Sequence, residues 1–337
     1  MITNTARTLI RRRSLAGLLA AGAMLAGAGI AVDGAAAAGT AQVAGGTLIV
    51  SGDRGADRIA LRLEAGVPTR LQVDFGDDGT ADATFDRATF DRIAVQAGRG
   101  DDTVRIDDAN GTFTDTEITT ISGDRGDDTM LGGGGNELFF GGPGDDVADG
   151  NRGADVGVMG AGDDTFIWDP GDGSDVVEGQ RGYDTMDFNG ADGAETFAMT
   201  PNGPRLRFLR QPGNIVMDTD GVERVDVDAL GGTDAVTVDD LSGTDVVKVR
   251  VDLAADLGGT TGDATADPVV VNATAGGDDV DVRPRDGQVV VRGLAATVTV
   301  AAPDPTLDTL TVNMLGGEDA VRLGAGLGGL IRTTVTA

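Results

Sequence analysis

Carboxylates recur every nine residues through the middle of the chain. Between residues 123 and 187, seven glycine-rich units of nine residues each carry Asp or Glu at the sixth place. A two-residue interruption, Trp168 and Asp169, follows the fifth unit. Carboxylate and carbonyl oxygens are the ligands that Ca²⁺ prefers in proteins. The spacing therefore predicts metal sites built on seven side chains: Asp128, Glu137, Asp146, Asp155, Asp164, Asp175 and Asp184.

The rest of each unit explains how these carboxylates are positioned. Glycine at the first, second and fourth places permits a tight turn that points carbonyl oxygens into one small space, and the last three residues suffice for a short strand. If one unit forms half a coil, units two apart stack directly. The sixth places then divide between two edges, with Asp128, Asp146, Asp164 and Asp184 on one and Glu137, Asp155 and Asp175 on the other. Because Ca²⁺ takes about six to eight oxygens, two stacked carboxylates with several carbonyls would form each site, which gives about five sites.

The charge of this stretch points to metal-coupled folding. Residues 123–187 contain sixteen Asp or Glu and three Arg, a net charge of −13. Carboxylates stacked about 5 Å apart, the spacing of neighbouring strands, repel one another strongly. The stretch has few large apolar residues to offset that repulsion and the entropy of ordering. We therefore expect it to fold when it binds metal.

On these residues, the stretch resembles the RTX, or haemolysin-type, calcium-binding repeat. The resemblance implies a right-handed parallel β-roll that holds Ca²⁺ between successive turns. The sequence departs from the usual pattern where Glu137 replaces Asp and where Asn151 and Asp172 replace glycine or a neutral residue. Ala148 and Gly157 are small at the inward eighth place, so we expect thin packing in the middle of the roll. A flexible linker is the alternative, but a linker has no reason to keep a nine-residue phase.

Strand-like runs separated by turn residues flank the repeats on both sides, and helical periodicity is nearly absent. The predicted fold is all-β: a parallel β-roll or β-solenoid flanked by β-rich regions. We divide the chain into an export signal (1–38), an N-terminal β region (39–122), the calcium-binding roll (123–187) and a C-terminal β-solenoid or β-sandwich (188–337).

Single carboxylates in the flanking regions have two interpretations. Asp57 and Asp102 occupy the sixth place of isolated repeat-like units, so each would offer half a metal site or cap a plain turn. Beyond the roll, the nine-residue phase is lost. We expect four carboxylates there to cap turns rather than to bind metal: Asp234, Asp245, Asp279 and Asp319.

The first residues are typical of an export signal. Three arginines (11–13) precede an apolar run, and three alanines (36–38) provide a small-residue cleavage site. The arginines followed by Ser14 and Leu15 resemble a twin-arginine signal, and ordinary Sec export is the other route. We expect an extracellular protein with no membrane span after signal removal; retention of the apolar run as an anchor is the alternative.

Composition excludes several functions. The formal charge of −29 argues against nucleic acid as a partner, and the absence of His and Cys removes triads, dyads and zinc-protease motifs that need them. We therefore predict a non-enzymatic calcium-binding protein; no protein or glycan partner can be named. One alternative is a carbohydrate-active enzyme on a β-helix, for which Glu223, Arg224 and Asp226 are the candidates, although their alternation favours the solvated face of a strand. The other is an adhesive or structural rod at the cell surface.

The single tryptophan reports on the interruption of the repeats. Trp168 begins the two-residue break, so its surroundings depend on whether the fifth and sixth units form adjacent coils. In a folded roll it would either cover the small positions at Ala148 and Gly157 or pack at the junction with a flanking region. We expect it to be buried in both cases.

Overall fold

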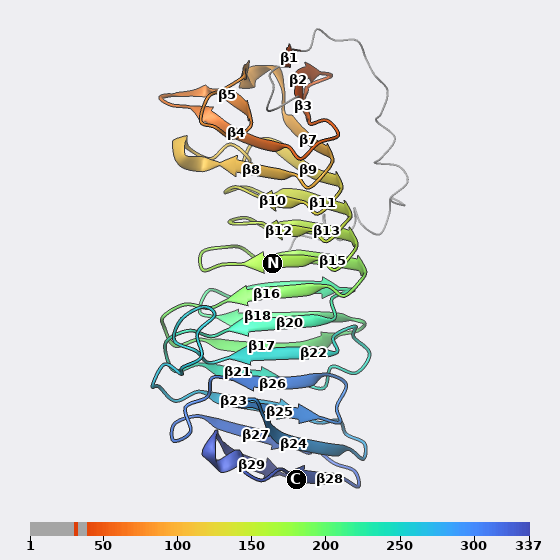
Figure 1. Cartoon of the computed structure of the whole chain (residues 1–337), viewed down its shortest axis with the longest axis vertical. Helices are drawn as coiled ribbons and strands as arrows, with labels where there is room; N and C mark the ends of the chain where they lie inside the picture. The colour runs from red at the N-terminus through yellow and green to blue at the C-terminus, as the bar shows by residue number, and fades with distance from the viewer. Residues whose placement is uncertain (1–29, 33–38) are drawn as a thin grey trace.

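The computed structural model describes residues 30–32 and 39–337. In this part of the chain, two long sheets face each other, and their strands stack as rungs along the longest axis of the molecule (Figure 1). No α-helix occurs in the described residues, which also form the 3₁₀ turns η2 (Arg87–Thr89), η3 (Asp108–Asn110) and η4 (Leu327–Gly329). The described residues contain no helix that is long and apolar enough to cross a membrane. The expected export signal, except for residues 30–32, lies outside the described residues.

The first sheet, sheet A, has fifteen strands among the described residues. In spatial order they are β1 (Ile30–Val32), β2 (Gly39–Ala44), β3 (Thr47–Ser51), β7 (Arg92–Arg99), β9 (Ile118–Arg125), β11 (Glu137–Pro143), β13 (Val156–Ala161), β15 (Val176–Arg181), β19 (Ile215–Asp220), β18 (Arg205–Gln211), β17 (Thr196–Asn202), β21 (Ala235–Val238), β23 (Pro268–Asn272), β27 (Thr309–Asn313) and β29 (Arg332–Thr336).

The second sheet, sheet B, has fourteen strands in the same part of the chain. In spatial order they are β6 (Ala83–Asp86), β5 (Val67–Phe75), β4 (Arg58–Glu64), β8 (Thr103–Asp107), β10 (Thr129–Leu131), β12 (Val147–Asp149), β14 (Thr165–Trp168), β16 (Thr185–Asn189), β20 (Arg224–Asp228), β22 (Lys248–Asp252), β26 (Thr297–Ala301), β25 (Gln288–Arg292), β24 (Asp279–Arg285) and β28 (Ala320–Leu323).

Each nine-residue unit forms half a coil. Successive units alternate between the sheets, so units two apart pair in parallel: Thr129 lies opposite Val147, Val147 opposite Thr165, and Thr165 opposite Thr185. The last of these pairings spans the two-residue break, so the roll continues through it. The chain thus has two turn edges: edge 1, where it passes from sheet A to sheet B, and edge 2, where it returns.

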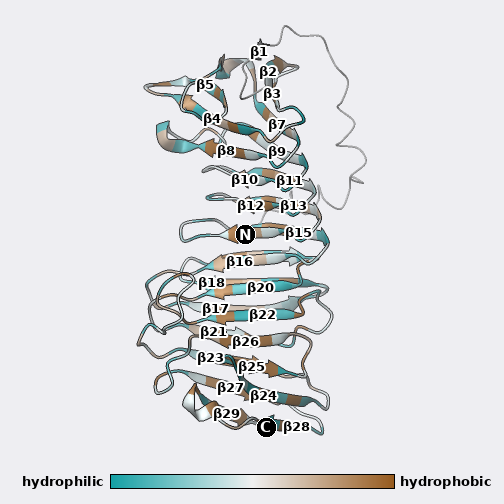
Figure 2. Cartoon of the chain, viewed as in Figure 1, coloured by the Kyte–Doolittle hydropathy of each residue, from teal (hydrophilic) through white to brown (hydrophobic). Residues whose placement is uncertain are grey.

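Buried and more exposed residues alternate along most strands, and Figure 2 shows hydrophobic and hydrophilic residues alternating along the ribbon. The apolar eighth places point inward, and Met130, Phe139 and Phe166 are almost completely buried. Thin packing in the middle of the roll was expected but is not observed. A Cβ atom on Gly157 would lie 2.9 Å from the ring of Phe166, so this ring fills the space above the glycine.

Trp168 lies at the junction between the roll and the C-terminal region. It is fully buried, and its ring stacks on Phe188 with centroids 4.0 Å apart. Phe188 in turn contacts Phe197 and Phe208 of the next strands. The indole Nε1 donates a hydrogen bond of 2.8 Å to the carbonyl of Gly173. Of the two placements expected for Trp168, the junction is the one observed.

Both sheets run without a break through positions 122/123 and 187/188, where the nine-residue repeats begin and end in the sequence. Residues 188–337 add strands to the same sheets, so the solenoid is observed there rather than a separate sandwich. Within residues 188–337, antiparallel meanders interrupt the coils twice, as β17–β18–β19 in sheet A and β24–β25–β26 in sheet B.

Candidate metal centre

The sixth-place carboxylates of edge 1 form one continuous column. The backbone N–H of Asp128 donates to Asp146 Oδ1 at 2.9 Å, that of Asp146 to Asp164 at 2.8 Å, and that of Asp164 to Asp184 at 3.0 Å. Each carboxylate thus caps the turn of the neighbouring coil with one oxygen. The structure therefore brings these four predicted residues together on one edge.

The column on edge 1 extends beyond the repeats at both ends. The N–H of Asp57 donates to Asp102 at 2.7 Å, and the N–H of Asp102 donates to Asp128 at 2.8 Å. At the other end, the N–H of Asp184 donates to Glu223 at 2.7 Å. Sequence reasoning treated Asp57 and Asp102 as isolated positions, each either half a metal site or the cap of a plain turn, but they are consecutive neighbours in space. Asp57 and Asp102 are 45 residues apart in the chain, and Asp102 and Asp128 are 26 residues apart. These unequal separations hide the stacking in the sequence.

Edge 2 carries the other three predicted residues. The N–H of Glu137 donates to Asp155 Oδ1 at 2.6 Å, and the N–H of Asp155 donates to Asp175 Oδ1 at 2.8 Å. The longer side chain of Glu137 turns back so that Oε2 accepts a hydrogen bond of 2.9 Å from the N–H of Gly133. Glu137 thus keeps its place in the column although it replaces the usual Asp.

The second oxygen of most of these carboxylates is buried without a partner. All seven predicted residues are at most 2% exposed. Hydrogen-bond partners are missing for Oδ2 of five of them and for Oε1 of Glu137; the residues concerned are Asp128, Glu137, Asp146, Asp155, Asp164 and Asp184. Burying an anionic oxygen without a partner costs several kcal/mol. A cation in the gaps between coils would remove that cost.

Glycines create the space around these oxygens. A Cβ on Gly141 would lie 2.3 Å from both Asp146 Oδ2 and the carbonyl oxygen of Met159, so a carboxylate and a carbonyl of the next coil converge there. At the fourth place, a Cβ on Gly144 would lie 1.8 Å from the carbonyl of Gly126, and φ of Gly144 is +146°. Any side chain at either place would displace oxygens from the gap between coils.

Burial and mutual repulsion make the charged form of these carboxylates unfavourable. Burial, reinforced by neighbouring carboxylates, raises the pKa of Asp128 and of Asp164 to about 7, and those of Asp146 and Asp184 to about 6. Burial also raises the pKa of Asp155 strongly, and the carboxylate of Asp175 adds to the effect. Without a counter-ion, the roll would therefore hold its carboxylates at a considerable cost in stability.

Arginine does not supply that counter-ion in the roll. In the described part of the chain, no Arg or Lys lies within salt-bridge distance of any of the seven predicted residues. By contrast, Arg205 of β18 lies 2.9 Å from Glu178 of β15 and 2.5 Å from Asp218 of β19. The sites would therefore consist of oxygen ligands with uncompensated negative charge, which suits Ca²⁺. The described residues contain no group of three or more His, Cys, Asp or Glu that could hold a metal ion. A site here would take two carboxylates and complete its shell with carbonyls and water.

The fifth-place carboxylates form a separate, exposed column. Its members Asp127, Asp145 and Asp163 are exposed to solvent. Asp127 Oδ1 accepts from the N–H of Asp145 at 2.8 Å, and Asp145 Oδ1 accepts from the N–H of Asp163 at 2.7 Å. Water reaches these groups, so they have no comparable need for a cation.

The residues considered for catalysis do not converge. Glu223 caps the turn of Asp184, whereas Arg224 and Asp226 form an ion pair on the outer face of β20. Arg224 also lines an open depression of about 710 Å³, together with Lys248 and Arg250. The three candidates thus serve a turn cap and a solvated strand face.

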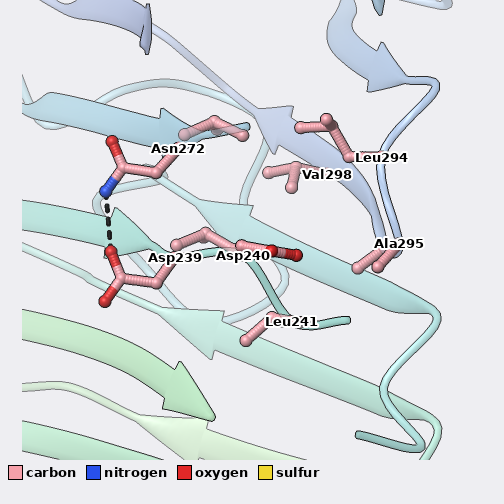
Figure 3. Close-up of a pocket in the computed structure, with 10 residues that line it drawn as sticks. Asp239, Asp240, Leu241, Asn272, Leu294, Ala295 and Val298 are labelled. Atoms are coloured by element: carbon pink, nitrogen blue, oxygen red, sulfur yellow. Dashed lines mark hydrogen bonds between the residues drawn. The ribbon is translucent and has the colours of Figure 1, made fainter. Parts of the chain in front are cut away.

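A small cavity lies between β21, β23 and the loop before β26 (Figure 3). Its volume is about 10 Å³, which is room for about one water molecule. Asn272 lines it and donates a hydrogen bond of 2.6 Å to Asp239. This cavity is too small for an organic substrate.

The single carboxylates of the C-terminal region differ from one another. Asp245 accepts from the N–H of Gly221 at 3.1 Å, and Asp319 accepts from the N–H of Asp278 at 3.0 Å, so both cap turns. Asp279 instead pairs with Arg322 on the surface. Asp234 is fully buried in a further column that sequence reasoning missed. The signal in the sequence that could have revealed this column is the position of Asp234 directly before a Val-rich strand.

Comparisons with known proteins add little. No protein-family model matches the chain, and no curated protein matches it. Among solved structures, it is similar to the crystal structure of the extracellular lipase LipA from Serratia marcescens, with 10% identity and a TM-score of 0.19. The match covers 65% of this chain and 43% of that one, and similarity at this level carries no argument about function.

Proposed function

We propose that this is a non-enzymatic, extracellular calcium-binding protein whose nonapeptide repeats bind Ca²⁺ between stacked turns and fold on binding. One observation carries the proposal: the sixth-place carboxylates are stacked and buried, with one oxygen of most of them lacking any partner. The resemblance of residues 123–187 to the RTX repeat supports the same function.

The proposed sites lie in the gaps between consecutive members of each column. In each gap, the unpartnered oxygen of one carboxylate would join its neighbour and the carbonyls around first-place glycines such as Gly141. Asp146 and Asp164 have a neighbour on both sides, so each would serve two ions.

The proposed extracellular location follows from the energetic cost of folding the roll without Ca²⁺. A chain whose repeats need Ca²⁺ would remain loose where calcium is scarce and fold where it reaches roughly 10⁻⁴ to 10⁻³ M, the range of extracellular modules. The expected N-terminal export signal fits this sequence of events.

Isothermal titration calorimetry of the purified chain tests the proposal. We expect saturable binding of about five or more Ca²⁺ ions, weaker binding of Mg²⁺, and persistence in NaCl of equal ionic strength. Heat that disappears in NaCl would show a diffuse polyanion instead, and the absence of Ca²⁺ binding would refute the proposal.

A further inference from the structure

A third carboxylate column stands on edge 2 of the C-terminal region, outside the nonapeptide repeats. Its members are the residues directly before β17, β21, β23 and β27: Glu195, Asp234, Asp267 and Asp308. The N–H of Glu195 donates to Asp234 at 2.7 Å, that of Asp234 to Asp267 at 2.7 Å, and that of Asp267 to Asp308 at 2.9 Å. These hydrogen bonds repeat the geometry of the roll, although the partners are 33 to 41 residues apart in the chain.

The centre of this column is buried and carries uncompensated charge. Asp234 is fully buried and its Oδ2 has no hydrogen-bond partner, while Asp267 is 2% exposed. Asp263 adds a third carboxylate nearby, where it accepts from the N–H of Gly232 at 2.9 Å. In the described part of the chain, no Arg or Lys lies within salt-bridge distance of these three carboxylates. Glu195, at the end of the column, differs because Arg210 pairs with it.

The carboxylates oppose one another's ionisation. Burial raises the pKa of Asp234 to about 7, and the carboxylates of Asp267, Glu195 and Asp263 add to the effect. Burial likewise raises the pKa of Asp267 to about 6, with a further contribution from Asp263. As in the roll, the arrangement lacks a positive charge between stacked coils.

We propose that a calcium ion binds between the coils of Asp234 and Asp267, with these two carboxylates as ligands and backbone carbonyls and water completing the shell. Asp234 Oδ2 is the unpartnered oxygen that the ion would take, and Asp263 strengthens the negative potential beside it. The available ligands are all oxygens, which fits Ca²⁺ better than the softer transition metals. This site lies outside residues 123–187 and stands on its own carboxylates.

Hydrogen exchange of the full chain, followed by mass spectrometry with and without Ca²⁺, separates this site from the roll. We expect Ca²⁺ to protect residues 230–272 in the wild type. Asp234→Asn should abolish that protection and leave the protection of residues 123–187 intact. Asp256→Asn is the matched control, because it removes the same charge from an exposed position of the same region.

Thermal unfolding distinguishes a ligand from a plain turn cap. In chelator, Asp234→Asn should be at least as stable as the wild type, since it removes repulsion and keeps an oxygen for the N–H of Glu195. With Ca²⁺, the variant should lose the stabilisation that the wild type gains. Equal destabilisation in both conditions would identify Asp234 as a cap only and overturn the proposal.

The outcomes also keep the two proposals apart. Calcium-dependent protection of residues 123–187 alone would refute this site and leave the function of the roll standing. Protection of residues 230–272 alone would support this site and refute the function proposed for the roll.

Discussion

The turn columns of the roll and the junction of the roll with residues 188–337 belong to the same two sheets, yet they compensate clustered carboxylates differently. In the roll, the stacked sixth-place carboxylates have no arginine within salt-bridge distance, whereas at the boundary with the C-terminal region Arg205 pairs with Glu178 of β15 and with Asp218 and Asp220 of β19. The arginine acts as a built-in cation. The turn columns of the roll have no such arginine, and most of their carboxylates keep one buried oxygen without a hydrogen-bond partner.

The comparison also shows what the nine-residue phase contributes. Asp234 and Asp267 form the same kind of column as Asp146 and Asp164, although their spacing is 33 rather than 18 residues. Stacking on one edge of the solenoid therefore makes the column. The strict nine-residue repeat instead places glycine in every turn of the roll, which keeps these turns tight.

The largest effect should follow from filling a turn of the roll. Gly144→Ala would place a Cβ 1.8 Å from the carbonyl of Gly126 at φ +146°, so we expect a loss of ~3 kcal/mol or more in stability with Ca²⁺. Gly193→Ala in the C-terminal region, where nothing lies within 4 Å of the new atom, should change little. Thermal unfolding measures both. Equal losses would mean that turns in the two regions are not under different constraints.

Removing the built-in cation should have the next largest effect. Arg205→Met leaves Glu178 and Asp218 without their shared guanidinium, and we expect a loss of about 2 kcal/mol, discounted because Arg205 is 21% exposed. Urea unfolding in saturating Ca²⁺ provides the measurement. A change within error would show that arginine does not replace a metal ion there.

Neutralising one column member should change calcium binding more than overall stability. Asp146→Asn removes a buried carboxylate with neighbours on both sides, so it should lose more bound Ca²⁺ than Asp145→Asn, which removes an exposed one. Calorimetric stoichiometry gives the comparison. Equal losses from the two variants would indicate a diffuse acidic surface rather than discrete sites.

The smallest expected effect is spectroscopic. Trp168 is fully buried at the junction of the two regions and hydrogen-bonded to Gly173, two residues before Asp175. We expect Ca²⁺ to shift its fluorescence to the blue, NaCl of equal ionic strength to have no such effect, and Asp175→Asn to weaken the response. A spectrum that does not change in the calcium-saturated protein would contradict ordering of this junction by the metal.

The sequence predicts the roll well because glycine and carboxylate positions repeat at a fixed spacing. If one unit forms half a coil, that spacing divides the carboxylates between two edges, and the pairing of units two apart agrees with this condition. The spacing does not reveal Asp57 and Asp102 as neighbours of Asp128, since strands and loops of unequal length separate them. The meanders β17–β18–β19 and β24–β25–β26 likewise have no local signal, because only pairing between distant strands decides their place in the sheets.

Far-UV circular dichroism of the purified chain, titrated with Ca²⁺ from excess chelator, tests the central claim most directly. The account predicts that residues 123–187 are largely disordered in chelator and that β signal grows as Ca²⁺ passes through roughly 10⁻⁴ to 10⁻³ M. The change should be complete by about 10 mM, ten times the upper end of that range. A spectrum that is the same in chelator and in 10 mM Ca²⁺, about the highest concentration needed, would contradict metal-coupled folding of the roll.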